Sequence, residues 1–338
     1  MRNSSIELFR IICAISIIIL HFFGWFLGGL TPIDSLTNAN IIDIFRLVFV
    51  SLTIVCVNCF ILISGFFGIT LKPQKVINLL VTLLLIFVSL YFIDVLLGKK
   101  FEWMSFFSNI LCVSRGGYFV QCYFVLMFLS PLLNVFVEKY EKNIISFVLF
   151  LTILELYTDC IRHIDSMGIQ RGYSIFHFCL MYLWGRCVYI HKDRLLQNKK
   201  VLWFLSYLFC ACIILFMYIF NIPFAFNYSS PFVIAGSISL FAIFLYKSYY
   251  IKIINTIASS TFTVFIVNCI DPVKRYLVEI DEVLLSYGNT FFYLSTSFCV
   301  IICTFCIAVL YDKLIQLAIK PTSIVLCEYY DKIRQRWI

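Results

Sequence analysis

Apolar stretches of about twenty residues follow one another along this sequence, and only short polar segments separate them. A helix needs roughly 20 apolar residues to cross a hydrocarbon core of ~30 Å. Backbone N–H and C=O groups inside a membrane must also be paired within the spanning structure, which favours helices. The stretches therefore predict an all-α, polytopic transmembrane helical bundle with about ten spans.

The composition excludes most other classes of protein. Of the 338 residues, 62% are hydrophobic and 13% are charged, whereas a soluble domain has roughly 45–50% apolar and about 25% charged residues. This excludes a disordered chain, a collagen and an ordinary soluble enzyme. We expect one transmembrane bundle over residues 1–311 and a cytoplasmic interfacial tail over residues 312–338, where apolar and basic residues alternate.

Ten spans can be placed along the chain from hydropathy alone. They are residues 11–30, 45–68, 76–98, 118–138, 144–160, 174–190, 201–220, 230–246, 256–272 and 291–311. Residues 101–113 are expected to form a short interfacial or re-entrant helix. The first stretch is expected to stay in the mature protein, because no small-residue cleavage site follows it.

The distribution of basic residues predicts the orientation of the bundle. With ten spans both termini lie on one side, and 18 of the 26 Lys and Arg residues fall on that side. The positive-inside rule then makes both termini cytoplasmic in the cell membrane. No nucleic acid is expected as a partner, since no basic face with interleaved aromatic residues is present. Most of the 15 cysteines lie inside apolar stretches, so no metal site is expected.

The first span carries the clearest candidate site, formed by Glu7, Arg10 and His21. His21 lies eleven positions after Arg10, which places both on one helix face, about 16.5 Å apart along the axis. We expect Arg10 at the inner membrane surface, paired with Glu7, and His21 near the bilayer centre. A neutral imidazole there can accept a proton from a hydroxyl, and the Arg10 guanidinium suits a phosphate. The alternative is a packed histidine and an arginine that anchors the helix.

Several further polar residues are candidates for ligand binding, because polar groups inside a span are costly and default to functional roles. Lys72 and Lys75 follow the second span on the inner side. The possible substrate-binding residues are Asn58, Ser64, Gln121 and Trp184. Each has a structural alternative: the small residues at Ser64-Gly65 permit close helix contact, and Gln121 could bond a neighbouring helix. His177 is expected to be structural.

Five segments together resemble the integral-membrane acyltransferase family 3. They are Glu7-Leu-Phe-Arg10 followed by His21, Phe60-Ile-Leu-Ile-Ser-Gly-Phe-Phe67, Ser130-Pro-Leu-Leu-Asn134, Tyr182-Leu-Trp-Gly185 and Ala258-Ser-Ser-Thr-Phe-Thr-Val-Phe265. They follow one another in the family's order from residue 6 to about residue 268. Two departures stand out. Asn268 occupies a position where members often have His, and Lys72-x-x-Lys75 replaces an Arg-x-x-Arg pair.

The resemblance implies an enzyme that moves an acyl group, with acetyl as our expectation, from acyl-CoA to a hydroxyl of a glycan. The acceptor would be a cell-envelope or exopolysaccharide glycan or its lipid-linked precursor. Arg10, Lys72 and Lys75 would bind the CoA phosphates, and His21 would act as the base with Glu7 orienting Arg10. Acetyl-CoA would be a substrate, and no permanently bound cofactor is implied. The other partners are membrane lipids and, as open alternatives, a second copy of the chain or glycan-assembly proteins.

A second class of function competes with this interpretation. A glycan flippase or secondary transporter would also place polar groups in the middle of the membrane. Such proteins often contain paired inverted repeats with interrupted helices, and the sequence shows no internal repeat. Consumption of a thioester would distinguish the enzyme from the carrier.

Overall fold

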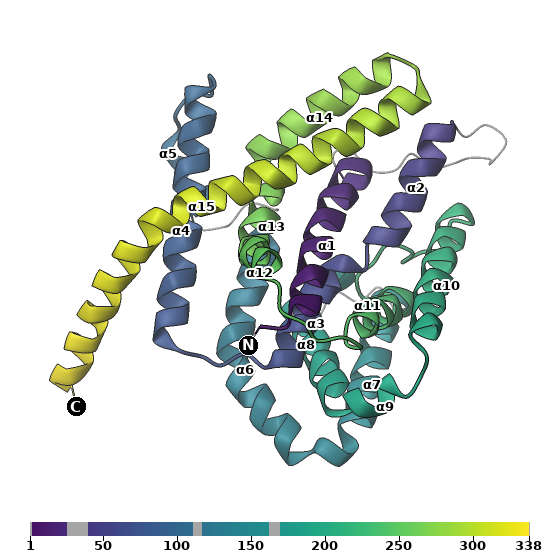
Figure 1. Ribbon diagram of the computed structural model, residues 1–338, viewed down its shortest axis with the longest axis horizontal. Coiled ribbons are helices and arrows are strands. Elements are labelled where there is room, and N and C mark those ends of the chain that lie inside the picture. The colour runs from purple at the N-terminus through teal and green to yellow at the C-terminus, as the bar shows by residue number, and fades with distance from the viewer. Residues whose placement is uncertain (1, 26–39, 111–116, 162–169, 338) are drawn as a thin grey trace.

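The computed structural model describes residues 2–25, 40–110, 117–161 and 170–337, and the regular elements in these ranges are all helices. The α-helices are α1 Ser4–Leu20, α2 Ile41–Thr53, α3 Cys56–Phe67, α4 Pro73–Leu96, α5 Trp103–Ile110, α6 Tyr118–Lys139, α7 Ile144–Leu156, α8 Ile175–Ile190, α9 Lys192–Leu196, α10 Lys200–Ile219, α11 Pro231–Ile243, α12 Lys252–Ala258, α13 Thr261–Cys269, α14 Asp271–Ser286 and α15 Thr290–Trp337. Two π-helical turns, η1 His21–Trp25 and η4 Tyr157–Ile161, extend α1 and α7, and short 3₁₀ turns form η3 Glu141–Asn143 and η6 Gln170–Gly172. The predicted all-α bundle is confirmed (Figure 1).

Seven segments of the described chain are long and apolar enough to cross a membrane. They are Ser4–Gly24, Ile41–Phe67, Pro73–Leu96, Tyr118–Lys139, Lys200–Ile219, Lys252–Cys269 and Thr290–Ile319. The number ten is not confirmed, because α7, α8 and α11 contain only 13, 16 and 13 residues. At 1.5 Å per residue, α8 is about 24 Å long, which is shorter than the hydrocarbon core.

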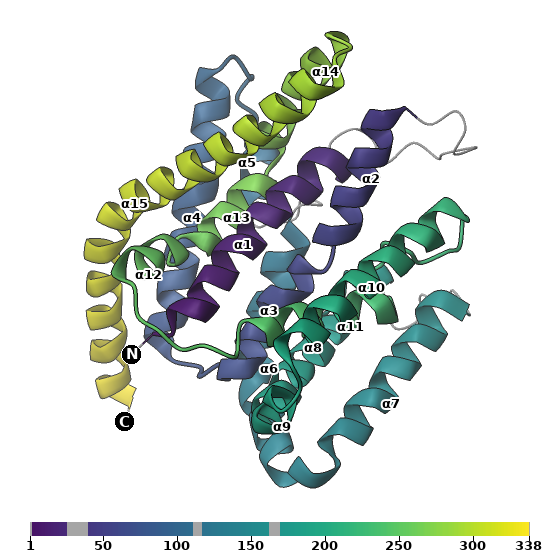
Figure 2. The same ribbon diagram turned by 45° about the vertical axis from the view of Figure 1, so that its right-hand side comes forward.

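The helices run between two ends of the bundle (Figures 1 and 2). One end, here called the lysine end, holds the start of α1, the α3–α4 connection with Lys72 and Lys75, the α6–α7 connection and α9. The opposite end, here called the loop end, holds the α4–α5 and α14–α15 connections and the C-terminus of α10.

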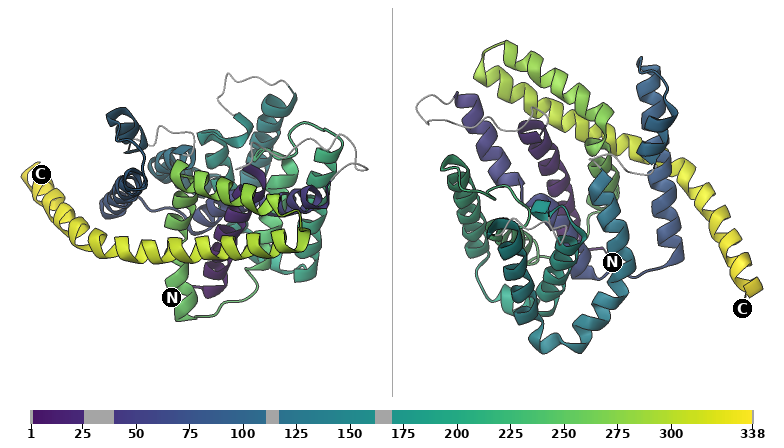
Figure 3. Two further views of the ribbon diagram at one scale, coloured as in Figure 1. Left: turned by 90° about the horizontal axis from the view of Figure 1, so that it is seen from above. Right: turned by 180° about the vertical axis from the view of Figure 1, so that it is seen from behind.

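The last helix continues without interruption from Thr290 to Trp337. It therefore contains both the expected span 291–311 and the expected tail, and the division at residue 312 stays a prediction. Figure 3 shows α15 bending along one side of the bundle, with its C-terminal part projecting beyond the other helices.

The first helix begins at Ser4, seven residues before the start expected from hydropathy. Polar contacts explain the difference. Asn3 caps the helix by accepting a hydrogen bond from the Ser5 N–H. The buried Ser4 hydroxyl contacts Asn255 at 2.9 Å, and the Ser5 hydroxyl donates to the Phe244 carbonyl at 2.8 Å. Because these partners satisfy the polar side chains, the helix extends past its apolar stretch. Residues 26–30 of the expected span lie outside the described residues.

Helices α3 and α8 cross at the closest approach that backbones allow. A Cβ atom on Gly65 would lie 2.1 Å from the Tyr182 carbonyl oxygen, and one on Gly185 would lie 2.3 Å from that of Leu62. Only glycine fits at both positions, because real Cβ contacts do not fall below 3.0 Å. The close helix contact expected from the small residues at Ser64-Gly65 is therefore present, and it brings the ends of α3 and α8 together at the lysine end.

Candidate functional site

The first helix presents the expected pair of charged residues. The Arg10 Nη1 atom lies 3.5 Å from the Glu7 Oε1 atom, one helical turn away. The Glu7 side chain is buried, whereas that of Arg10 is 28% exposed. The Arg10 guanidinium carbon lies 5.9 Å from the centroid of the Phe67 ring at the end of α3. Arg10 is thus held by a carboxylate and an aromatic ring while part of it stays accessible to a ligand.

His21 lies where α1 changes into the π-helical turn η1. Such turns are rare and are frequently found at functional sites. The imidazole is half-buried and hydrogen-bonds the backbone of Asn268, near the end of α13. The buried Asn268 side chain donates from Nδ2 to the Val264 carbonyl at 2.8 Å. The structure thus places Asn268 beside the imidazole, a position for which the resemblance supplied no role.

The turn that joins α3 to α4 is closed by a ring of hydrogen bonds. The Ile69 N–H donates to the Tyr182 hydroxyl oxygen at 2.9 Å, and this hydroxyl donates to Asn134 Oδ1 at 2.7 Å. The Asn134 Nδ2 atom donates to the Ile69 carbonyl at 3.1 Å, which closes the ring. Gly68 precedes this ring with a φ of 72°, which favours glycine. Two of the segments that carry the family resemblance, those with Asn134 and Tyr182, therefore meet at the turn that directly follows a third.

Four basic residues gather around this turn, and we call them the cation cluster: Arg10, Lys72, Lys75 and Arg186. A Cβ on Gly68 would lie 3.3 Å from Arg186 Nη1, so this guanidinium lies directly against the turn. Lys72 is the N-cap residue of α4, and Lys75 Nζ donates to the Thr70 hydroxyl at 2.8 Å. Both lysines are exposed. Among the described residues, Glu7 is the one carboxylate within 4 Å of any of the four cations.

A cavity of about 470 Å³ opens beside Arg186 at the lysine end. It is lined by Val137, Glu138, Glu141, Arg186, Tyr189, Ile190, Lys192 and Asp193. Its three carboxylates and two cations give the lining mixed charge. Arg186 belongs to both places. The part of the cation cluster formed by Arg10, Lys72 and Lys75 is the more favourable place for a phosphate group, because Glu7 is the one described carboxylate within 4 Å of these three cations.

Comparison with models of protein families gives a match over most of the chain. Residues 3–312 match a family model described as an acyltransferase domain. The chain belongs to acyltransferase family 3. The resemblance stated from the five segments is confirmed, and the protein is a membrane acyltransferase. No curated protein and no solved structure matches the chain significantly.

The other candidate residues of the acyltransferase occupy different surroundings. Ser64 donates to the Phe60 carbonyl at 3.1 Å and lies 3.3 Å from the Tyr123 hydroxyl. Trp184 donates from Nε1 to the Thr152 hydroxyl at 3.1 Å and so joins α8 to α7. Gln121 is exposed on α6. Their roles in substrate binding stay predictions.

Asn58 belongs to a fully buried chain of polar side chains. Its Oδ1 atom lies 3.0 Å from His177 Nε2, and its Nδ2 atom donates to the Tyr228 carbonyl at 3.0 Å. On the other side of the imidazole, His177 Nδ1 lies 3.1 Å from both Glu155 carboxylate oxygens. Both polar atoms of Asn58 therefore have buried partners, and its role in substrate binding stays a prediction.

Sequence reasoning missed three of these residues as members of a site. Arg186 stands out as a charged residue in the expected span 174–190 but receives no predicted role, and Asn134 and Tyr182 enter only as parts of motifs. Glu155 carried a usable signal, because a carboxylate inside an apolar stretch requires a buried partner. No sequence pattern links Glu155 to His177, which lie 22 residues apart on different helices.

Proposed function

We propose that this acyltransferase moves an acyl group, specifically acetyl, from acyl-CoA to a hydroxyl of a cell-envelope or exopolysaccharide glycan or its lipid-linked precursor. The single observation that supports it best is the cation cluster. One of its members, Arg10, lies on the same helix as His21. A donor bound at the cluster would have a direct route along α1 toward the imidazole.

The cluster suits the donor because coenzyme A carries several phosphate charges. Arg10 and Arg186 offer planar forks that bond two phosphate oxygens at once, and the two lysines add point charges. The lysine end also holds most of the basic connections, so we propose that it faces the cytoplasm, where acyl-CoA is made. Both termini would then be cytoplasmic in the plasma membrane.

His21 is the group that we propose to activate the acceptor. A sugar hydroxyl would give its proton to the imidazole while its oxygen attacks the thioester carbonyl carbon. The C–O bond forms, the C–S bond breaks, and the departing sulfur takes the proton from the imidazolium. The products are a sugar ester and free CoA. In a two-step variant, the imidazole is first acylated and then transfers the group to the hydroxyl.

Thioester consumption by the purified protein in lipid nanodiscs tests this proposal. We would supply acetyl-CoA with an extracted envelope glycan fraction and measure free CoA together with acetyl ester on the glycan. We expect wild type to release CoA and His21→Ala to lose at least about a hundredfold in rate, the typical contribution of a general base.

The control is His191→Ala, which removes a histidine at the C-cap of α8. We expect this variant to keep the wild-type rate. Wild-type activity in a folded His21→Ala protein would overturn the role of the imidazole. In sealed proteoliposomes, glycan movement across the bilayer without any CoA release would favour the carrier.

A further inference from the structure

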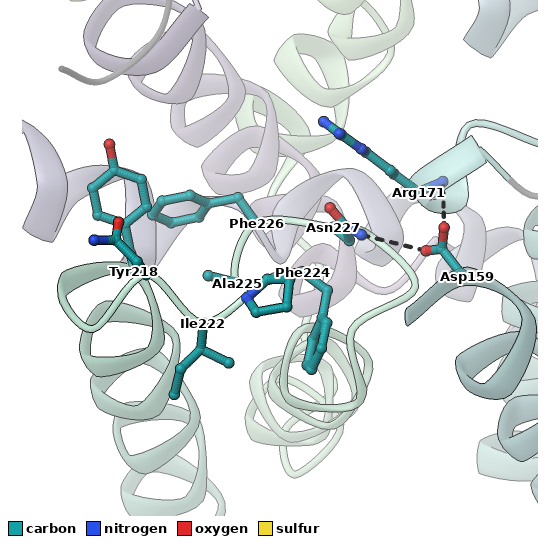
Figure 4. A pocket seen from close by; sticks show the side chains of 10 residues that line it. Asp159, Arg171, Tyr218, Ile222, Phe224, Ala225, Phe226 and Asn227 are labelled. Atoms are coloured by element: carbon teal, nitrogen blue, oxygen red, sulfur yellow. Dashed lines mark hydrogen bonds between the residues drawn. The ribbon is translucent and has the colours of Figure 1, made fainter. Parts of the chain in front are cut away.

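A second cavity of about 340 Å³ lies beside the C-terminus of α10, at the loop end of the bundle (Figure 1). Figure 4 shows it from close by. We call it the loop pocket. It is lined by Asp159, Arg171, Tyr218, Asn221, Ile222, Pro223, Phe224, Ala225, Phe226 and Asn227. Its volume falls within the range of roughly 300–1,000 Å³ that is typical of small-molecule sites.

Backbone strain is concentrated in the loop pocket. The described residues contain three non-glycine residues with left-handed φ values: Arg171 at 60°, Asn221 at 51° and Phe224 at 65°. All three line this cavity. Such a conformation is uncommon for arginine and a true outlier for phenylalanine. Strained residues cluster at ligand sites, where the surrounding structure holds them in place.

Asp159 holds the two strained segments together. Its Oδ1 atom accepts from the Arg171 N–H at 3.0 Å, and its Oδ2 atom accepts from Asn227 Nδ2 at 3.3 Å and from the Ser229 hydroxyl. Figure 4 shows Asn227 and the Arg171 backbone meeting at this carboxylate. The Tyr228 N–H also donates to the Arg171 carbonyl at 3.1 Å. Because its backbone groups are occupied, Arg171 is fixed while its side chain stays exposed.

The lining combines aromatic faces with planar polar groups. Tyr218 and Phe226 form a ring pair with centroids 5.0 Å apart, and the half-buried Phe224 ring points away from this pair (Figure 4). Asn221, Asn227 and the Arg171 guanidinium supply hydrogen-bonding groups. A saccharide ring presents apolar C–H faces and a rim of hydroxyls, which matches this combination of surfaces.

We propose that the loop pocket binds a short saccharide segment of the acceptor, with C–H faces against the Phe224 ring and against the Tyr218–Phe226 pair, and with hydroxyls toward Arg171 and Asn227. This inference rests on the proposed function and adds to it the place where the acceptor is recognised. Donor and acceptor would then enter the bundle from opposite ends.

Binding to an array of immobilised neutral and acidic mono- and oligosaccharides tests the proposal. The labelled full-length protein in nanodiscs would be compared with Phe224→Ala and Arg171→Gly, since glycine keeps the left-handed backbone at position 171. We expect wild type to retain a subset of the saccharides and both variants to bind them at least about tenfold more weakly.

The matched control is Phe220→Ala. Phe220 is an exposed phenylalanine at the same end of α10, and it does not line the pocket. We expect it to bind saccharides within about twofold of wild type. Unchanged binding of acetyl-CoA would show that each variant is folded. Equal saccharide binding by wild type and Phe224→Ala, or no retained saccharide at all, would overturn the proposal.

The array separates this inference from the proposed reaction, because it requires neither donor nor turnover. Saccharide binding without thioester consumption would support the saccharide site in the loop pocket and would contradict the proposed reaction. Acetyl transfer by Phe224→Ala with an unchanged KM for the acceptor would contradict saccharide binding in the loop pocket, while the proposed reaction would still hold.

Discussion

At the scale of single residues, the hydrogen bonds among Glu155, His177 and Asn58 restrict where hydrogens can lie in this buried chain. Asn58 Nδ2 donates to a carbonyl, so Asn58 Oδ1 is the acceptor toward the imidazole and His177 Nε2 must carry a hydrogen. His177 Nδ1 then faces Glu155 either as an imidazolium with a carboxylate or as a neutral ring with a carboxyl group. Both arrangements have zero net charge, which explains how an acid can lie fully buried in an apolar bundle.

This pairing predicts that removal of one partner is more harmful than removal of both. His177→Ala leaves the Glu155 carboxyl buried without its partner and should cost about 3–5 kcal/mol in free energy of unfolding. Thermal unfolding in detergent would measure the two single variants and the double variant Glu155→Ala with His177→Ala. We expect the double variant to cost less than the sum of the single ones. Additive costs, or a similar loss in the control His191→Ala, would contradict the pairing.

At the scale of helices, the crossing of α3 and α8 fixes the geometry of the lysine end. Gly65→Ala places a methyl group against the Tyr182 backbone, which cannot move aside as a side chain can. We expect a loss of about 1–3 kcal/mol in free energy of unfolding, the usual cost of overpacking, and a lowered transfer rate.

Gly236→Ala is the graded control for this substitution. Its new Cβ would meet a Val55 side-chain methyl at 3.0 Å, and a side chain can yield. Thermal unfolding of the two variants should therefore show a smaller loss for Gly236→Ala. A Gly65→Ala protein as stable as wild type would show that the helices are not in contact as described.

The turn between α3 and α4 should control donor binding through its hydrogen-bond ring. Tyr182→Phe removes the hydroxyl that joins Ile69 to Asn134, at a cost of about 1 kcal/mol. Because the turn sets the direction of Lys72 and Lys75, we expect a several-fold rise in the KM for acetyl-CoA and little change in kcat. Steady-state kinetics would measure both, with Tyr140→Phe at an exposed position as the control. A fall in kcat at constant KM would contradict this role.

Hydropathy located most helices well but not their ends or partners. The period and length of apolar stretches reflect burial in lipid, so the long spans were found. The start of α1 and the extent of α15 depend on polar contacts such as that of Ser4 with Asn255, 251 residues away. The pairing of Glu7 with Arg10 is local to one helix and was predictable. The meeting of Asn134, Tyr182 and Ile69 is a property of the folded bundle and was not.

At the scale of the whole molecule, the cation cluster and the residues with left-handed backbone conformations lie at opposite ends of the bundle. The cation cluster occupies the lysine end, and the three strained non-glycine residues of the described chain occupy the loop end. The buried chain from Glu155 through Asn58 ends at the Tyr228 carbonyl, one residue after Asn227 of the loop pocket lining. This separation suits a protein that accepts two substrates from two sides of a membrane.

If the lysine end binds the donor electrostatically, the KM for acetyl-CoA should depend on salt concentration and on whether the cations are lysine or arginine. The double variant Lys72→Arg with Lys75→Arg keeps both charges and adds bidentate donors, so we expect a lower KM for acetyl-CoA. Raising the salt from low ionic strength to 0.5 M should raise the KM of wild type, since exposed charges are screened. Kinetics at two salt concentrations would test both points, with Lys142→Ala as a control at an exposed position. A KM that is indifferent to salt would contradict electrostatic capture.

The most direct measurement is equilibrium binding of acetyl-CoA to the purified protein in nanodiscs, comparing wild type, Arg10→Ala and His21→Ala. We expect His21→Ala to bind within about twofold of wild type, because the imidazole acts in chemistry, and Arg10→Ala to bind about tenfold more weakly, because it loses a charged contact to phosphate. Absence of binding by wild type, or equal binding by wild type and Arg10→Ala, would contradict a donor site at the cation cluster.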